Sequence, residues 1–316
     1  MGVVGAMNAV RVFAYGGPNV LELGITPRPV AAPGEVLVEV AGAGVNPVDC
    51  KTRAGGGIAR RLGDSPFPII LGWDIAGTVV ALGDGVTQFG VGDRVFGCVN
   101  FPRLGSAYAE YATAPVGELA KVPAGLDLIE AGAMPLAALT AWQALDAADM
   151  SAGQRLLVTG ASGGVGHFVV QLARRRGIEV VAVTSGRNQA FLRELGAHEV
   201  IDYATEDVVT KAGDVDVLFD ALGSASIDAL WPALRRGGAI VSILSGFAAD
   251  RVPEGITGTN ILIRPDGAQL AQIANLVDSR RLRVHIEEVF SMADAARAHE
   301  RSETGHVRGK LALRLA

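Results

Sequence analysis

The chain has 316 residues, of which 49% are hydrophobic and 41 are glycine, so we expect one large or two ordinary globular domains. The net charge of −5 and the scattered basic residues argue against a dedicated nucleic-acid surface. No apolar run approaches the ~20 residues of a membrane span, and two lone cysteines suit a reducing compartment, so we expect a cytoplasmic protein.

The first third of the chain is predicted to be rich in β-structure. Alternating or apolar runs bounded by glycine and proline predict strands at residues 8–15, 21–23, 35–40, 72–80, 92–96 and 107–113. The only helix expected before residue 128 is a short one near residues 49–53. Residues 130–148 are rich in alanine and predict helical structure that is broken by Pro135.

After Gly153 the pattern changes to alternating strands and helices. Predicted strands occupy residues 156–159, 180–184, 200–203, 215–220 and 239–244. Gly177, Gly196 and Gly237 are expected at the C-caps of helices, where glycine avoids the left-handed penalty. This alternation predicts an α/β fold with a doubly wound parallel sheet.

The alternation stops near Pro265. A helix at 267–279, a strand at 282–286 and a helix that starts at Ser291, with Asp294 as its capping-box partner, are expected next. The final strand, 309–315, is expected to return to the β-rich domain because the parallel sheet is already complete. The predicted domains are 1–128, 129–266 and 267–316, the last returning to the first.

The predicted nucleotide site begins at residues 155–167. A buried strand breaks into a glycine turn, and a helix follows, which lets the backbone and the helix N-terminus approach a pyrophosphate. The fingerprint G-x-G-x-x-G has alanine in its first place here, and any glycine-rich turn gives a similar pattern. The expected cofactor contacts in this turn are Ala161, Ser162, Gly163, Gly164 and Val165.

The end of the second predicted strand indicates which nucleotide binds. An NAD-type site places an acid there to bind the ribose 2′-hydroxyl, about 20 residues past the glycines. This chain has Thr184, Ser185 and Arg187 instead, two hydroxyls and a guanidinium that suit a 2′-phosphate. We therefore predict NADPH as the cofactor, with a solvated surface arginine as the alternative for Arg187.

Five sequence blocks in order carry a resemblance to a known family. They are residues 44–51 (GVNPVDCK), 71–79 (LGWDIAGTV), 92–95 (GDRV), 163–166 (GGVG) and 305–310 (GHVRGK). Together they resemble the medium-chain dehydrogenase/reductase superfamily, and more narrowly its zinc-free quinone oxidoreductase branch, with zeta-crystallin and the plant alkenal and enone reductases. The resemblance implies a Rossmann domain inserted in a β-rich, GroES-like catalytic domain.

The resemblance also implies roles for individual residues. Lys51 would hydrogen-bond the nicotinamide ribose or stabilise an enolate, and Asn46 would hold the ribose or the carboxamide. Their alternatives are an exposed lysine and a loop amide before Pro47; Asp49 is expected to be a helix N-terminal acid. The remaining implied contacts are for the cofactor Thr140, Tyr203, Leu222, Gly223, Leu244, Ser245 and Lys310, and for the substrate Trp73, Phe101 and Phe247. Packing is the alternative for Thr140, for Tyr203 and for the three substrate aromatics.

No metal is expected. The zinc members of the superfamily have cysteine where Asn46 stands and histidine where Trp73 stands, and neither an amide nor an indole is a zinc ligand. Without a metal, hydride addition to a conjugated carbonyl is the reaction that needs least assistance.

We therefore expect an enzyme that passes hydride from NADPH to a small electrophile, either a quinone or an α,β-unsaturated carbonyl. The alternatives are a non-catalytic NADPH-binding protein like some zeta-crystallin relatives, and an enoyl-thioester reductase. A homodimer is expected by analogy alone, and no nucleic-acid or membrane partner is expected.

Overall fold

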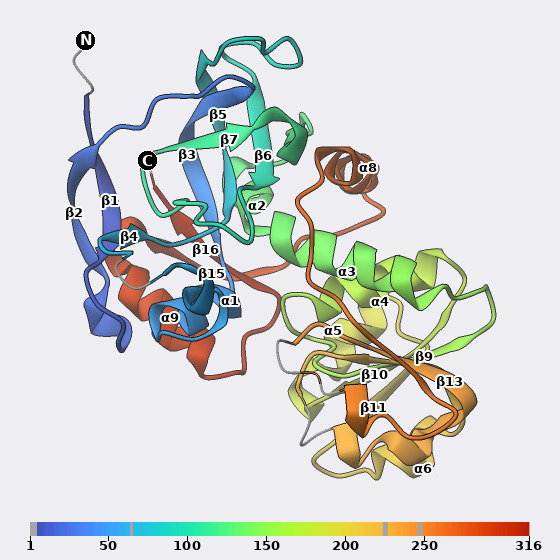
Figure 1. Cartoon of the computed structure of the whole chain (residues 1–316). Helices are drawn as coiled ribbons and strands as arrows, with labels where there is room; N and C mark the ends of the chain where they lie inside the picture. Colours follow the sequence, from blue (N-terminus) through green and yellow to red (C-terminus); the bar gives the residue numbers. More distant parts are fainter. Residues whose placement is uncertain (1–4, 64–65, 224–226, 245–246, 248, 316) are drawn as a thin grey trace. The chain divides into compact units, whose positions relative to one another are not determined.

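The computed structural model describes residues 5–63, 66–223, 227–244, 247 and 249–315. The chain divides into two compact units (Figure 1). The two-part unit consists of Met1–Leu139 and Arg264–Ala316, and the inserted unit is Thr140–Ile263. Our domain division after residues 128 and 266 stays a prediction, while the observed units change over after Leu139 and Ile263.

The two-part unit contains two β-sheets. A three-stranded sheet has the order β2-β1-β4, and a seven-stranded sheet has the order β15-β16-β3-β5-β6-β8 with β7 also paired to β3. The strands of this unit are β1 (Ala6–Val12), β2 (Glu22–Pro27), β3 (Glu35–Val45), β4 (Ile69–Ile70), β5 (Asp74–Leu82), β6 (Arg94–Cys98), β7 (Tyr111–Pro115), β8 (Leu119–Lys121), β15 (Ile286–Ser291) and β16 (Lys310–Arg314).

Strand β3 is the centre of the larger sheet, because it pairs with β5, β7 and β16. Its alternating sequence places Val36, Val38 and Val40 in the core without exposed surface. The strand runs beyond the predicted 35–40 to Val45. The antiparallel pairing of β16 with β3 confirms that the end of the chain returns to the β-rich unit.

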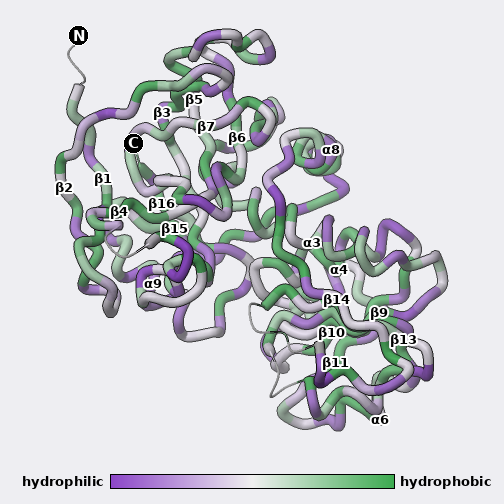
Figure 2. Tube along the Cα trace, in the orientation of Figure 1, coloured by the Kyte–Doolittle hydropathy of each residue, from purple (hydrophilic) through white to green (hydrophobic). Residues whose placement is uncertain are grey.

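The inserted unit is built on a parallel six-stranded sheet. Its order is β11-β10-β9-β12-β13-β14, and all five pairings are parallel. The strands are β9 (Arg155–Val158), β10 (Glu179–Thr184), β11 (Glu199–Asp202), β12 (Val215–Asp220), β13 (Leu234–Ser242) and β14 (Thr257–Asn260). Most of their apolar residues, such as Leu156 and Leu157 in β9, are buried. Figure 2 shows the hydropathy along the chain. The parallel sheet confirms the predicted α/β fold.

The helices follow local capping signals. Pro135 stands at the first position of α3, where proline is tolerated, so it separates two helices as predicted. Asp127 and Asp266 cap α2 and α8 by accepting backbone N–H groups. No helix of the described residues is long and apolar enough to cross a bilayer. The described helices are α1 (Pro47–Arg53), α2 (Leu128–Ala133), α3 (Pro135–Ala148), α4 (Gly166–Arg175), α5 (Gln189–Glu194), α6 (Val208–Ala212), α8 (Gly267–Asp278) and α9 (Ala295–Glu303).

Three local predictions were wrong. The strand expected at 282–286 begins four residues later, at Ile286, and runs to Ser291. Gly237 lies inside β13 instead of ending a helix, although its φ of +76° still explains the glycine. Ser291 is followed by one 3₁₀ turn, and its hydroxyl donates to Asp294 (2.6 Å) instead of capping α9 directly. Gly177 and Gly196 have the expected positive φ after α4 and α5.

Candidate functional site

The glycine turn of the inserted unit connects β9 to α4. Gly160 has a φ of +60°, and the Gly163 N–H donates to the Gly160 carbonyl (3.0 Å). A Cβ on Gly166 would lie 2.7 Å from the Ala161 Cα, so α4 begins at a glycine because its start passes close to the turn. Among the described residues, the N–H groups of Gly164 and Val165 have no acceptor. The turn therefore fits a phosphate at the N-terminus of a ten-residue helix.

Hydrogen bonds join this turn to the end of β10. The Ser162 hydroxyl accepts from the hydroxyl of Thr184 (3.1 Å) and from the amide of Asn188 (3.0 Å). Thr184 and Asn188 are buried, whereas Arg187 is exposed and Ser185 is half-buried. The three residues predicted to bind the 2′-phosphate thus differ in their surroundings. Thr184 supports the glycine turn, whereas Ser185 and Arg187 are accessible to solvent. Sequence reasoning missed Asn188, although a polar residue next to Arg187 was the available signal.

A carboxylate that sequence reasoning also missed lies beside the same turn. Asp202 ends β11, and a Cβ on Gly186 would lie 2.7 Å from its Oδ2. Its Oδ1 accepts from the Ala204 N–H (3.1 Å), so it also shapes the following turn. Asp202 lies beside the turn after β10 because it pairs with Thr184 in the register of the parallel strands β10 and β11.

The remaining predicted contacts of this unit stand where its strands end. Tyr203 follows β11 and is 55% exposed, which rules out the core-tyrosine alternative. Leu222 is 57% exposed, and Asp220 Oδ1 accepts the N–H groups of Leu222 and Gly223 (3.0 Å each). Of the other predicted cofactor contacts, Thr140 is buried in α3 and Leu244 is half-buried, while Ser245 lies outside the described residues.

In the two-part unit, a cluster of charged groups surrounds Asn46, which lies between β3 and α1. The Asn46 Oδ1 accepts from the Lys310 ammonium, and its Nδ2 donates to Asp74 Oδ2 (2.9 Å). Lys310 also donates to the Val45 carbonyl (3.2 Å), and its Nζ is 3.9 Å from Asp74 Oδ2. Asn46 and Lys310 are each 2% exposed. The structure thus brings two predicted residues together, 264 positions apart in the sequence.

Asp49 adds a second buried carboxylate to this cluster. Its Oδ2 accepts from the Asn46 N–H (2.6 Å) and the Tyr108 hydroxyl (3.1 Å), while Oδ1 has no partner among the described residues. It is the helix N-terminal acid that we predicted for α1. Burial raises the pKa of Asp49 to about 7 and the pKa of Asp74 to about 6. Burial lowers the pKa of Lys310, although both carboxylates oppose that shift.

A hydrogen-bond chain leads from Asp49 toward the surface. Arg53 can only donate, so its contact with His299 Nδ1 (3.2 Å) fixes the proton on Nε2. That nitrogen then donates to Tyr108 (3.1 Å), whose hydroxyl donates to Asp49. Burial and the Arg53 charge lower the pKa of His299 to about 3, so its ring is neutral. Sequence reasoning missed Tyr108, His299 and the Arg53–Glu303 ion pair (2.5 Å).

The other predicted residues lie apart from this cluster. Lys51 is exposed on α1, and Trp73 is fully buried with its indole N–H donating to the Arg103 carbonyl (2.5 Å). Trp73 and Phe101 pack edge to face, with centroids 5.5 Å apart. Phe247 belongs to the inserted unit and packs against its core. The predicted substrate group is therefore only partly assembled within one unit, and its role stays a prediction.

The residues at the position of the zinc ligands do not fit a zinc ion. The Asn46 amide is engaged by an ammonium and a carboxylate, and the Trp73 indole is not a ligand. Cys50 and Cys98 are buried thiols, and burial raises the pKa of Cys50 to about 12. Within the part of the chain that the structure describes, no group of three His, Cys, Asp or Glu side chains is placed to hold a metal.

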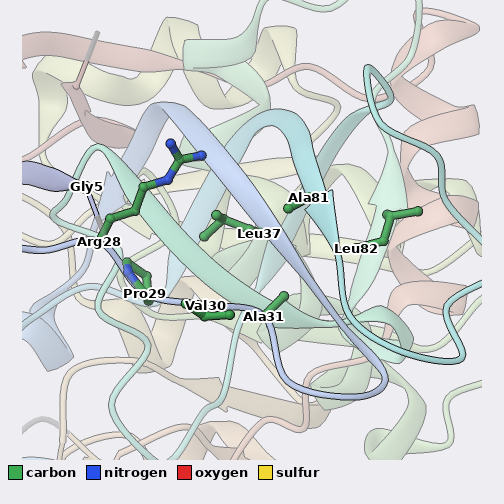
Figure 3. Close-up of a pocket in the computed structure, with 8 residues that line it drawn as sticks. All are labelled: Gly5, Arg28, Pro29, Val30, Ala31, Leu37, Ala81 and Leu82. Carbon is green, nitrogen blue, oxygen red and sulfur yellow. The ribbon is translucent and has the colours of Figure 1, made fainter. Parts of the chain in front are cut away.

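A separate hollow of about 310 Å³ lies on the two-part unit (Figure 3). Its lining is apolar apart from Arg28, whose guanidinium lies 3.7 Å from the Tyr111 ring centroid. The lining residues are Gly5, Arg28, Pro29, Val30, Ala31, Leu37, Ala81 and Leu82. None of them is a predicted site residue, so we do not assign the reaction to this hollow.

Comparisons with known proteins agree with this architecture. Residues 32–124 match the family described as alcohol dehydrogenase GroES-like domain, and residues 195–313 match the family described as zinc-binding dehydrogenase. The chain is 32% identical to a 2-methylene-furan-3-one reductase of Solanum lycopersicum, over 97% of this chain and 79% of the relative. It is 31% identical to an NADPH-dependent alkenal/one oxidoreductase of Arabidopsis thaliana, over 95% and 77% of the two chains.

Two solved structures are similar over nearly the whole chain. The quinone oxidoreductase from Coxiella burnetii has a TM-score of 0.92 and 36% identity, covering 99% of this chain and all of that one. A mycobacterial protein solved in complex with NADPH has a TM-score of 0.85 and 27% identity, covering 98% and 100%.

Proposed function

The chain belongs to the medium-chain dehydrogenase/reductase superfamily, and we propose that it is an NADPH-dependent reductase of quinones or α,β-unsaturated carbonyl compounds. The observation that carries the proposal is the glycine turn with its unpaired N–H groups among the described residues. Relatives named as quinone oxidoreductase and alkenal/one oxidoreductase support the same reaction class. A cytoplasmic location and a homodimer remain predictions.

The choice of NADPH over NADH rests on the turn after β10. Ser185 and Arg187 offer a hydroxyl and a guanidinium at an exposed turn, and a guanidinium pairs well with a phosphate dianion. Asp202 opposes an anion there, but its Oδ1 is already engaged by a backbone N–H. We therefore assign the 2′-phosphate to Ser185 and Arg187, with the glycine turn holding the pyrophosphate.

Bound NADPH would supply a hydride for the electron-poor carbon of the substrate. The chain would contribute orientation and a hydrogen-bond donor, since the donor set offers no zinc site. Asn46 would orient the nicotinamide end of the cofactor. Lys51, exposed on α1, would donate to the cofactor ribose or to the developing enolate oxygen, as the resemblance implies.

The proposal is tested with a panel of electrophiles. We expect the purified protein to oxidise NADPH with a quinone, an enone or an alkenal, as followed by the nicotinamide absorbance, after dialysis against a chelator. Tight NADPH binding without turnover on any compound would instead favour a non-catalytic binding protein. Turnover only with an enoyl thioester would favour an enoyl-thioester reductase.

Arg187→Glu is expected to reverse the cofactor preference. Replacing the guanidinium with a carboxylate removes a charge-assisted bond to the 2′-phosphate and adds repulsion. We expect kcat/KM for NADPH to fall about tenfold to hundredfold, while the value for NADH changes less. Arg193→Glu is the matched control, because Arg193 is also exposed but lies on α5 and bonds to Gln189 (2.9 Å). An unchanged preference in Arg187→Glu would place the phosphate elsewhere.

A further inference from the structure

The side-chain amide of Asn46 lies between two opposite charges. Its oxygen faces the ammonium of Lys310, and its nitrogen faces the carboxylate of Asp74 (2.9 Å). Rotating the amide by half a turn would place its NH₂ against the ammonium and its oxygen against the carboxylate. The two charges therefore admit a single orientation of Asn46.

The backbone around Asn46 is held by the same group of residues. Lys310 donates to the Val45 carbonyl (3.2 Å), and the Asn46 N–H donates to Asp49 (2.6 Å). Both the peptide and the side chain are thus fixed at the point where β3 ends and α1 begins. The Nδ2 of Asn46 donates one hydrogen bond, to Asp74, out of the two that an amide nitrogen can donate.

The surrounding backbone is shaped to admit this arrangement. A Cβ on Gly44 would lie 2.6 Å from Asp74 Oδ2, so only glycine lets the carboxylate lie against β3. Asp74 Oδ1 accepts from the Leu136 N–H (2.6 Å) at the start of α3, which leaves Oδ2 for Asn46. The carboxylate is therefore fixed from both sides.

Stability alone does not account for this arrangement. Asp74 is fully buried and Lys310 is 2% exposed, so both charges lose their hydration. Buried ion pairs of this kind are often no more stabilising than an apolar pair of the same size. An arrangement that costs desolvation and yields a single amide orientation points to a role in placing Asn46.

We propose that Lys310 and Asp74 are positioning residues that fix the Asn46 amide in the orientation needed by the nicotinamide cofactor. The inference rests on the proposed function, because it takes Asn46 to be the residue that meets the cofactor. It gives Lys310, which the resemblance implied as a cofactor contact, an indirect role. Lys310 acts through Asn46, and Asp74 sets the opposite end of the same amide.

The test compares Lys310→Met, Asp74→Asn and the double variant with the wild-type protein. Each single variant leaves one buried charge without its partner, so each should melt several degrees lower. The double variant is neutral and should regain most of the melting temperature. Because its Asn46 amide has lost both charges, we still expect kcat to fall about tenfold or more, as in Asn46→Ala.

Binding gives a second readout, which does not depend on turnover. The dissociation constant for NADPH, measured from nicotinamide fluorescence, should rise about fivefold to tenfold in the double variant. The matched control is Lys121→Met with Asp93→Asn, an exposed ion pair in the same unit (3.0 Å), which should change neither quantity.

The outcomes separate the two hypotheses. A double variant with restored melting temperature and unchanged kcat and NADPH affinity would overturn the positioning role. If the wild-type protein reduces no electrophile, the proposed function fails, and the NADPH dissociation constant of the double variant decides the positioning role by itself. In that case, weaker NADPH binding by a double variant whose melting temperature is restored supports the positioning role.

Discussion

Arg53→Met is expected to lower the free energy of unfolding by about 3–5 kcal/mol. Arg53 is 2% exposed and donates to the Gly16 carbonyl (3.1 Å), to His299 (3.2 Å) and to Glu303 (2.5 Å). Methionine keeps much of the packing but leaves the buried His299 Nδ1 and the half-buried Gly16 carbonyl without a donor. Each such orphan costs about 1–3 kcal/mol. Urea unfolding at constant pH measures the change.

The carboxylate partner provides a contrast. The Glu303 side chain is 40% exposed, so Glu303→Gln keeps an acceptor within reach of Arg53 and should cost less than Arg53→Met. Arg297→Met is the matched control on α9, because Arg297 is 67% exposed and its ion pair with Asp294 lies at the surface. We expect a change there within about 0.5 kcal/mol. Equal losses for Arg53→Met and Arg297→Met would show that the buried contacts contribute nothing.

Asp49→Asn is expected to change how stability depends on pH. Asp49 has a pKa near 7 in the folded protein against 3.8 for an exposed carboxyl, mainly through burial. Between these values the folded protein holds a proton that the unfolded chain has released, so stability falls as pH rises. One group contributes about 1.4 kcal/mol per pH unit over that window. From pH 5 to pH 7, Asp49→Asn should therefore gain about 2 kcal/mol relative to the wild-type protein, because the group is already half titrated at pH 7.

Comparing the two proteins removes the contributions of other groups. Asp74, whose pKa is raised to about 6, has the same sign as Asp49. The buried neutral His299, with its pKa lowered to about 3, has the opposite sign, because the unfolded chain takes up its proton below about pH 6.5. Tyr108 stays protonated, since burial raises its pKa well above the usual value. The Lys310 charge and the Tyr108 hydrogen bond both oppose the upward shift of the pKa of Asp49.

Asparagine suits position 49 because it resembles the protonated carboxyl in shape. Its oxygen accepts the same two donors, and its NH₂ replaces Oδ1, which has no partner among the described residues. The unpaired NH₂ shifts stability by a constant amount at every pH. Asp93→Asn is the control, because Asp93 is a surface carboxylate whose pKa is lowered, so it should show no slope above pH 5. Parallel stability curves for the wild type and Asp49→Asn would contradict the assignment.

Local patterns predicted most of the fold. The strand–helix alternation and the glycines at the ends of α4 and α5 depend on residues close together in the sequence, and they were enough to predict the parallel sheet. The segment 282–291 was harder, because its apolar and charged residues give two similar strand registers. Pairing with β16 selects the later one, and that partner lies far away in the sequence.

The glycine turn that we propose as the nucleotide site was predictable for the same reason, because it occupies consecutive residues. The cluster around Asn46 was not predictable from the sequence. His299 and Arg53 are 246 positions apart, and neither belongs to a pattern that indicates burial. Lys310 was noticed through its motif, but only the pairing of β16 with β3 shows that its ammonium turns inward to Asn46.

The place of β16 in the sheet also orders events on the ribosome. All of Thr140–Ile263 is synthesised before Lys310–Arg314, and no strand of the parallel sheet pairs with Lys310–Arg314. Until those last residues are synthesised, the edge of β3 that pairs with β16 is open, and the Asn46 side chain lacks its hydrogen bond from the Lys310 ammonium. Strand β3 is therefore synthesised before the inserted unit but gains its β16 partner only after it, and an unpaired strand edge exposed in that interval is a site that chaperones can protect.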